Sequence, residues 1–265
     1  MTTPSGPIGF RCHHLHKVYA GRNGSVRALE DVTFSVGEHE FVCIVGPSGC
    51  GKTTLLKIIA GLLEPSSGHI AVTVGPANDR HQRALVFQTH GLFPWMTVLD
   101  NAAFGLEMRG VERRESRERA KALIEQLGLG AFCENYPHEL SAGMGQRVGI
   151  IRAFLTDPQI LLMDEPFGSL DAQTKLVLQD ELLRMWKSNP RMVIYVTHDI
   201  EEAILLGDRI LVMTGRPGRI RAQIPVPLGR PRDLSTRDAP VIAEVKCQIW
   251  NMLKEEVCQS LRVLS

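Results

Sequence analysis

Residues 40–62, EFVCIVGPSGCGKTTLLKIIAGL, constrain the fold of this chain more than any other stretch. The apolar run Phe41 to Val45 is typical of a short buried strand, and the residues after Thr54 repeat apolar side chains at helical spacing. The turn between them matches the pattern G-x-x-x-x-G-K-[ST], in the strand, loop and helix context that gives the pattern its meaning. The sequence therefore predicts a phosphate-binding loop (P-loop) in an α/β fold.

The chemistry of this loop follows from its residue types. Glycines let the backbone curl so that several N–H groups converge on phosphate oxygens, together with the positive end of the following helix. Lys52 can then reach the β- and γ-phosphates of ATP, and the Thr53 hydroxyl can bind Mg²⁺. The alternative is a glycine-rich turn before a helix, with no ligand. Cys50 occupies a variable position of the loop and is expected to have no role beyond fitting there. The predicted ATP-binding residues here are Gly46, Pro47, Ser48, Gly49, Cys50, Gly51, Lys52, Thr53 and Thr54.

A second buried-type strand, Ile160 to Met163, ends in two acidic residues, Asp164 and Glu165. In a parallel sheet the carboxyl ends of the strands face the ligand, so both acids should lie near the bound phosphates. Asp164 suits the Mg²⁺ site, and Glu165 suits the role of general base toward the attacking water. The alternative is that the two acids only cap the following turn.

A third apolar strand, in RMVIYVTHDIEEA, carries His198 at its end. Its place at the same edge of the sheet favours a contact with the γ-phosphate. A core histidine or a neighbour of a helix cap is the alternative.

The stretch between Lys52 and Asp164 is longer than a compact nucleotide-binding core needs, which indicates an inserted segment. Within VERRESRERAKALIEQLGLG, four apolar side chains fall at helical spacing, and Gly128 or Gly130 can end the helix. The charged run from Glu112 to Lys121 is expected to be the solvated face of this helix. The four apolar residues are Ala120, Leu123, Ile124 and Leu127.

Taken together, the motifs resemble those of the nucleotide-binding subunits of ABC transporters over about residues 10–225. They occur in the order of that family: Tyr19 in HKVYA, the P-loop, Gln88 in VFQTHGLFPWMTVLDN, LSAGMGQR, ILLMDEP, GSLDA and VTHD. The segments FPWMTVLDNAAFGL and GDRILVMTGRPGRI are similar to the branch that serves nitrate, sulfonate and taurine importers. The resemblance implies a P-loop core with a mainly parallel sheet, an N-terminal antiparallel β subdomain and an inserted α-helical signature subdomain at about 89–157.

The resemblance also implies roles for individual residues. Tyr19 would stack on adenine. Gln88 would reach Mg²⁺ and the attacking water, and the segment from Gln88 to Asn101 would dock on a coupling helix of the permease. Asp171 would lie at the seam between two ATPase subunits, and His198 would hold the γ-phosphate.

In such a dimer, the LSAGMGQR stretch would contact the nucleotide held by the partner chain. Ser141, Ala142 and Gly143 would form an anion-binding helix start. Ala142 replaces the first glycine of the usual LSGGQ or LSGGM form, and Gly145 replaces a residue that is usually long and polar. Both departures put the affinity of the closed dimer in doubt, since Ala142 adds a methyl group and Gly145 costs about 1 kcal/mol relative to Ala in a helix.

The composition narrows the class of protein. A formal net charge of +1 gives no global attraction to nucleic acid. The six cysteines show no CxxC pair or zinc-like spacing, which fits reduced thiols in a cytosolic protein. No apolar run reaches the roughly 18 to 20 residues of a membrane span, and MTTPSGPIGF does not resemble a signal peptide. We therefore expect the chain itself to stay out of the bilayer. The family resemblance adds the expectation of a peripheral protein on the cytoplasmic face of the bacterial inner membrane.

The C-terminal part, residues 226–265, is expected to follow an ATPase domain at 1–225. Prolines mark a connector, and an amphipathic helix follows it. The helix is expected to pack on its own domain, with a partner or regulatory surface as the alternative. Its apolar stripe comprises Val241, Val245, Ile249, Leu253 and Val257.

The predicted function is that of the ATP-binding and hydrolysing subunit of an importer for a small anion. Its expected partners are a second ATPase subunit, identical or not, the transmembrane permease subunits and, indirectly, a periplasmic or extracellular substrate-binding protein. A soluble ABC-type ATPase in nucleic-acid repair or translation is the alternative. Repair members usually carry a long coiled-coil insertion and translation members a second cassette, and neither pattern is found in this sequence.

Overall fold

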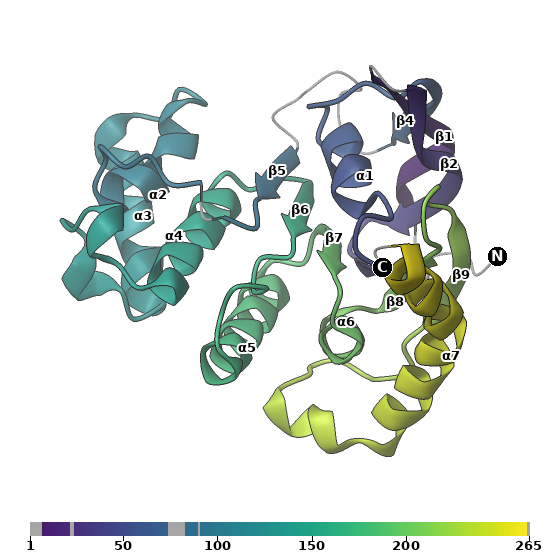
Figure 1. Cartoon of the computed structure of the whole chain (residues 1–265). Helices are drawn as coiled ribbons and strands as arrows, with labels where there is room; N and C mark the ends of the chain where they lie inside the picture. Colours follow the sequence, from purple (N-terminus) through teal and green to yellow (C-terminus); the bar gives the residue numbers. More distant parts are fainter. Residues whose placement is uncertain (1–6, 22–23, 74–82, 90, 264–265) are drawn as a thin grey trace. The chain divides into compact units, whose positions relative to one another are not determined.

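A computed structural model describes residues 7–21, 24–73, 83–89 and 91–263. The chain forms two compact units (Figure 1), one from residues 1–80 and 187–265 and the other from residues 81–186. Helices and strands alternate through both units, which confirms the α/β class.

The first unit begins with an antiparallel sheet of strand order β2-β1-β4. Its strands are β1 (Ile8–Gly21), β2 (Gly24–Gly37) and β4 (Ser67–Val72). In β2, buried Val32, Phe34 and Val36 alternate with more exposed residues, as expected for a sheet with one face on a core. This sheet is the N-terminal antiparallel β subdomain that the sequence predicted.

A second sheet in the same unit carries the strand of the P-loop. Its order is β7-β3-β8-β9, parallel except for β9. Every residue of β3, β7 and β8 is buried, as in a parallel sheet covered on both faces. The elements are β3 (Phe41–Val45), β7 (Met192–Thr197), β8 (Arg209–Met213) and β9 (Ile220–Pro225), with helices α1 (Lys52–Ile59) and α6 (Ile200–Leu206).

A buried ion pair joins these two sheets. Arg209 on β8 makes a bidentate contact with Glu40, with Nε to Oε1 at 2.7 Å and Nη2 to Oε2 at 2.9 Å. The same guanidinium donates to the Ser35 carbonyl oxygen on β2 at 2.6 Å, and Glu40 accepts from the Gly37 N–H at 2.8 Å. The side chains of the pair are only 4% and 7% exposed, so each charge depends on the other.

The second unit combines a two-stranded parallel ladder with four α-helices. Strands β5 and β6 pair with Val86 opposite Met163. Helix α3 ends where the sequence predicted, because Gly128 adopts a left-handed φ of 71°. The elements are β5 (Arg83–Val86), β6 (Ile160–Asp164), α2 (Val98–Glu107), α3 (Arg113–Gln126), α4 (Ala142–Leu155) and α5 (Ala172–Ser188), with short 3₁₀ turns η2 (Gly130–Phe132) and η3 (Pro137–Glu139).

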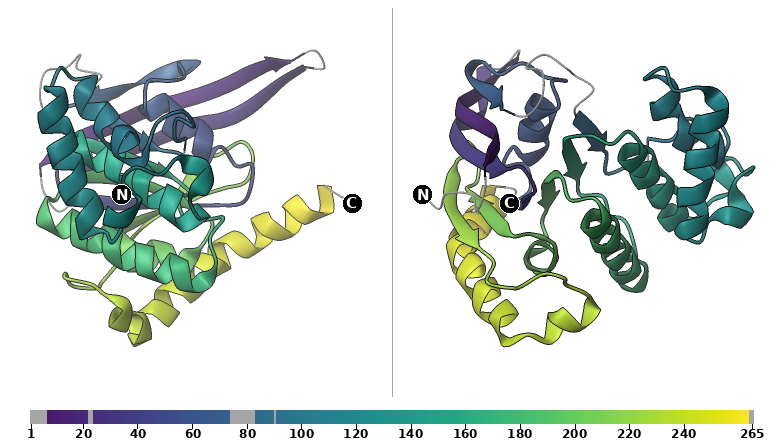
Figure 2. Two further views of the ribbon diagram at one scale, coloured as in Figure 1. Left: turned by 90° about the vertical axis from the view of Figure 1, so that its left-hand side faces the viewer. Right: turned by 180° about the vertical axis from the view of Figure 1, so that it is seen from behind.

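The C-terminal part returns to the first unit. After the 3₁₀ turn η4 (Leu234–Asp238), helix α7 (Pro240–Val263) packs against α6 and β8, which confirms that it lies on its own unit (Figures 1 and 2). The buried stripe begins at Ile242, one residue after the predicted Val241, which is half-buried. Val245, Ile249 and Leu253 are buried as predicted, and the side chain of Val257 lies outside the described part.

An arginine of the connector fixes the end of α6. Arg232 donates through Nη1 to the carbonyl oxygens of Ile204 at 3.0 Å and Gly207 at 2.7 Å. A cation at a helix C-terminus is stabilised by the helix dipole and the last carbonyl groups. Burial, with the nearby Arg230, lowers the pKa of Arg232 to about 10, so the side chain still carries its charge near pH 7.

None of the helices in the described part of the chain is long and apolar enough to cross a membrane. The cysteines whose side chains are described are all free thiols; they are Cys12, Cys43, Cys50, Cys133 and Cys247. Burial raises the pKa of the Cys43 thiol well above its usual range.

The buried pair of Arg209 and Glu40 predicts that replacing one partner destabilises the protein far more than replacing both. Arg209→Met should lower the free energy of unfolding by about 3 to 5 kcal/mol, because Glu40 would remain buried without its partner. Adding Glu40→Met should recover most of that loss. Urea unfolding followed by circular dichroism measures both, and equal losses in the single and double variants would contradict the account.

Candidate functional site

The predicted phosphate-binding loop connects β3 to α1 in the first unit. Lys52 is 6% exposed, and its ammonium group donates to the carbonyl oxygens of Gly46 at 2.8 Å and Pro47 at 3.0 Å. The positive charge is therefore held inside the curve of the loop. The Cys50 thiol is buried and turns toward Gly46.

The closing turn of the loop accepts only glycine. Gly51 has a left-handed φ of 106° and forms the N-cap of α1. A Cβ atom there would lie 2.8 Å from Leu29 Cδ2 and 2.9 Å from the Ala28 carbonyl oxygen, both on β2. Because Gly51 has no side chain, no side-chain group caps the start of α1. The arrangement fits an anion as the partner of the first N–H groups of this helix.

The structure places Tyr19 and His198 in the same unit as the loop. Tyr19 is 41% exposed, and its hydroxyl lies 3.4 Å from Thr54 Oγ1 at the start of α1. His198 is exposed and directly follows Thr197, which pairs with Val45 at the end of β3. The P-loop and His198 thus follow two paired strands of one sheet, β3 and β7, whereas Tyr19 comes from β1 of the antiparallel sheet.

In the second unit, two other predicted residues converge. A Cβ atom built on Gly168 would lie 3.5 Å from Glu165 Oε2 and 3.7 Å from Gln88 Nε2. The ladder explains this meeting, because Val86 on β5 pairs with Met163 on β6, and Gln88 and Glu165 each come two positions after their member of that pair. Asp164, the last residue of β6, is 9% exposed.

The backbone at Glu165 is strained. Glu165 has a φ of 45°, in the left-handed region that non-glycine residues rarely adopt, and its carbonyl oxygen accepts from the Gly168 N–H at 3.0 Å. Strain of this kind costs about 1 to 3 kcal/mol and is concentrated at functional sites. The turn therefore holds this carboxylate in place against the local preference of the chain.

The LSAGMGQR stretch starts α4 in the same unit. Ser141 is exposed, and its hydroxyl caps the helix by accepting from the Met144 N–H at 3.3 Å. Ala142 is also exposed, whereas a Cβ atom on Gly143 would lie 2.7 Å from Thr174 Cγ2. One of the small residues thus permits close packing of α4 against the start of α5.

Asp171 directly precedes α5, beside that contact. It is exposed, and its Oδ1 accepts from the Thr174 N–H at 3.0 Å and the Gln173 N–H at 3.1 Å. The hydrogen bond from the Thr174 backbone, followed by those from its side chain and from Gln173, lowers the pKa of the carboxyl group. Asp171 therefore remains an anion at the helix N-terminus at neutral pH.

Asn101 organises the segment that follows Gln88, and the sequence reasoning gave it no role of its own. It is fully buried, accepts from the Phe93 N–H at 2.8 Å and donates to three carbonyl oxygens of the preceding loop at 3.0 to 3.1 Å. The loop it ties down presents Trp95, which is 69% exposed. In the sequence, the polar amide of Asn101 among apolar residues of the expected helix could have indicated this role.

The sequence reasoning also missed Arg216. Its Nη2 donates to the carbonyl oxygen of Gly49 in the P-loop at 3.3 Å. Arg216 and Gly49 lie 167 positions apart, so no local sequence pattern could have indicated this contact.

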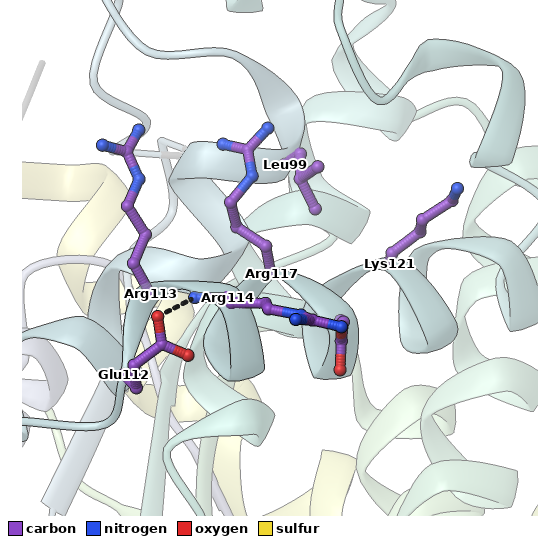
Figure 3. A pocket seen from close by; sticks show the side chains of 7 residues that line it. Leu99, Glu112, Arg113, Arg114, Arg117 and Lys121 are labelled. Atoms are coloured by element: carbon purple, nitrogen blue, oxygen red, sulfur yellow. Dashed lines mark hydrogen bonds and ion pairs between the residues drawn. The ribbon is translucent and has the colours of Figure 1, made fainter.

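Charged side chains of α3 surround a pocket in the second unit (Figure 3). Arg113 is 72% exposed and Arg114 84% exposed, which confirms that this run is the solvated face of the helix. Glu112 begins the helix by accepting from the Arg114 N–H at 3.1 Å. None of the predicted nucleotide-binding residues lines this pocket; its lining is Leu99, Glu112, Arg113, Arg114, Arg117, Glu118 and Lys121.

The sequence matches the ABC transporter family over residues 29–168, more than half of the chain. The chain belongs to the ABC transporter family. This ABC protein is 45% identical to a taurine import ATP-binding protein of Rhizobium johnstonii, covering 91% of this chain and 94% of the relative. It is 44% identical to a nitrate import ATP-binding protein of Synechocystis, with 81% of each chain covered.

A solved structure supports the same assignment. It is a dimeric ATP-binding cassette in a post-hydrolysis state, bound to ADP and Pi, with a TM-score of 0.74 and 30% identity; the similarity covers 83% of this chain and all of that chain. The ABC protein is accordingly an ATPase cassette, and the predicted family and fold are confirmed.

Gly24 and Gly51 have similar φ values, but their surroundings predict that alanine at these two positions lowers the free energy of unfolding by different amounts. Gly24 has a φ of 115°, and apart from its chain neighbours no atom of the described residues lies within 4 Å of a Cβ added there. Gly24→Ala should therefore cost only the strain of a left-handed residue, about 1 to 2 kcal/mol, while Gly51→Ala should cost clearly more because of its clash with β2. Urea unfolding midpoints measure both, and equal shifts would contradict the tight contact at Gly51.

Proposed function

We propose that this ABC ATPase energises the import of a small anion such as nitrate, a sulfonate or taurine. The proposal is supported by the names of two relatives, which are import ATP-binding proteins for taurine and nitrate. The protein would act on the cytoplasmic face of a bacterial inner membrane, bound to transmembrane permease subunits. A periplasmic or extracellular binding protein would deliver the cargo, so the ATPase itself would not select it.

ATP is the substrate that fits the P-loop. The curled backbone, the inward Lys52 ammonium and the uncapped start of α1 suit a polyphosphate. The exposed Tyr19 ring beside Thr54 would stack on adenine. His198 at the adjacent strand end would donate to the γ-phosphate.

The oxygen donors also fit Mg²⁺. Thr53 and Asp164 would hold the ion, with Gln88 as a further ligand. Mg²⁺ commonly binds through one or two protein groups together with substrate phosphates and water. When bound, Mg²⁺ neutralises charge on the phosphate oxygens.

The observation that carries the catalytic assignment is the convergence of Glu165 and Gln88 above Gly168. Glu165 would accept a proton from the attacking water, and Gln88 would orient that water. The strained backbone at Glu165 pre-positions the carboxylate, so little reorganisation is needed when ATP binds.

Hydrolysis is proposed to occur in a dimer, formed with an identical chain or with a different ABC ATPase. Ser141, Ala142 and Gly143 would meet the nucleotide bound by the partner, and Asp171 would lie at the seam. The solved cassette described as dimeric, with ADP and Pi bound, supports this proposal. The two exposed residues at the start of α4 are available for such a contact.

The segment from Gln88 to Asn101 would dock on the permease. Asn101 fixes its loop from within, and Trp95 offers an exposed aromatic ring of the kind that anchors protein interfaces. The connection between Gln88 and this loop would report the state of the nucleotide to the membrane subunits.

A soluble ABC ATPase acting in repair or translation is not favoured. The relatives compared above are import proteins, and the net charge of +1 offers no general attraction to nucleic-acid phosphates.

Glu165→Gln should preserve ATP binding and lower ATP turnover at least about 100-fold, because the amide cannot act as a general base. Phosphate release measures turnover, and calorimetry measures binding. Glu118→Gln, on the solvated face of α3, is the matched control and should hydrolyse ATP at the original rate. Unimpaired hydrolysis by Glu165→Gln would rule out the assigned base.

Trp95→Ser should weaken the association with the permease about 30-fold, as expected when an interface aromatic worth about 2 kcal/mol is lost. Its ATPase activity without the permease should be retained. Trp250→Ser removes a comparably exposed ring from α7 (52%) and should leave the association unchanged. Equal permease binding by both variants, measured by co-purification over a concentration series, would exclude Trp95 as an anchor.

A further inference from the structure

The loop between β8 and β9, residues 214–219, lies directly on the P-loop. Gly218 donates its N–H to the Ala28 carbonyl oxygen at 2.9 Å, and its own carbonyl oxygen accepts from the Glu30 N–H at 3.0 Å. A Cβ atom on Gly218 would lie 2.1 Å from the Cys50 carbonyl oxygen. The contact between the two loops is therefore made by backbone on both sides, with no space for a side chain.

Hydrogen bonds join the two ends of the 214–219 loop. The Thr214 N–H donates to the Arg219 carbonyl oxygen at 3.0 Å, and the Arg219 N–H donates to Thr214 Oγ1 at 3.1 Å. The Arg219 guanidinium pairs with Glu30 on β2, with Nε to Oε2 at 3.1 Å, and this pairing lowers the pKa of Glu30. The two ends of the loop are therefore joined to each other and, through Glu30, to β2.

Arg216 projects from this loop to the P-loop. Its Nη2 donates to the Gly49 carbonyl oxygen at 3.3 Å. On the opposite side of that same peptide plane, the Cys50 N–H donates to the Pro47 carbonyl oxygen at 3.3 Å. The plane between residues 49 and 50 is therefore held from both sides. This matters because Gly49 has no side chain and a φ of 75°, so its own dihedrals restrain it little.

Helix α7 contacts the same loop at Gly215, the residue before Arg216. Glu256 Oε2 accepts from the Gly215 N–H at 2.9 Å. Arg221 on β9 donates to the Met252 carbonyl oxygen at 2.7 Å and lies 3.5 Å from Glu256 Oε1, which orients the carboxylate. A continuous set of contacts thus runs from Glu256 through Gly215 and Arg216 to Gly49.

We propose that Arg216 positions the P-loop for the phosphates of a nucleotide, and that α7 sets the affinity of the site by holding the Arg216 loop through Glu256. This inference rests on the proposed binding of ATP at the P-loop. It gives the C-terminal helix a function beyond packing. A rearrangement of the C-terminal end of α7 would release Gly215, loosen Arg216 and lower nucleotide affinity without a contact between α7 and the nucleotide.

The test compares ADP binding by the full chain across five variants, measured by isothermal calorimetry. Arg216→Ala should weaken ADP binding about threefold to tenfold, the range expected when one hydrogen bond of ordinary net strength is lost. Arg216→Lys keeps the charge and one donor and should recover part of the loss. Arg114→Ala removes an equally charged, exposed side chain from α3 and should bind ADP like the unmodified protein.

The role of α7 is tested by a matched pair at Glu256. Glu256→Ala removes the acceptor of the Gly215 N–H and should weaken ADP binding about twofold to threefold, whereas Glu256→Gln retains an acceptor oxygen and should bind almost normally. In ATPase assays Arg216→Ala should raise KM for ATP and leave kcat nearly unchanged, which a general loss of folding would not produce.

Different outcomes test the role of Arg216, the link to α7 and the proposed function separately. Unaltered ADP affinity in Arg216→Ala would overturn the positioning role. Equal affinity in the Ala and Gln variants of Glu256 would overturn the link to α7. If the unmodified chain itself bound no ADP, the proposed function would fail, and the inference built on it would fail as well.

Discussion

The close approach of Gly51 to β2 is the contact on which the rest of the first unit depends. It closes the P-loop around the Lys52 ammonium and leaves the start of α1 without a side-chain cap. Such a turn is poorly stable by itself, since it combines left-handed glycines with a helix start whose N-cap residue offers no side-chain cap. Two sheets and the 214–219 loop compensate for this by surrounding it, and the buried pair of Arg209 and Glu40 joins those sheets.

In the second unit a strained non-glycine residue, Glu165, shapes the turn of the site, whereas glycines shape the P-loop in the first unit. Glu165 occupies a left-handed conformation at the end of β6, and its turn brings the carboxylate beside the Gln88 amide. The start of α4 looks unfavourable in sequence, yet Ser141 caps the helix and Gly143 allows close packing against Thr174. Gly143 of LSAGMGQR therefore has a packing role within the unit, in addition to the phosphate contact proposed for a dimer.

The sequence predicted those features that depend on local patterns. Strand β3 begins and ends at the predicted residues, and α3 ends before the predicted Gly128, because buried strands and helix ends carry short-range signals. The C-terminal stripe was misplaced by one residue at its start, since the fourfold spacing drifts around a helix and Ile242 is the better-placed side chain. The hydrogen bonds of Asn101, and the contacts of Arg216 with Gly49 and of Glu256 with Gly215, were beyond prediction. They join residues through tertiary packing, which no periodicity records.

The central claim is that two such chains close around ATP and that the altered signature stretch still permits closure. The most direct measurement is the mass in solution of the Glu165→Gln protein with and without Mg-ATP, beside the same protein carrying Ala142→Gly. We predict monomers without nucleotide and dimers with ATP in both proteins. A dimer only after Ala142→Gly would mean that the extra methyl group prevents closure of two identical chains. Monomers under all conditions, despite bound ATP, would contradict the account.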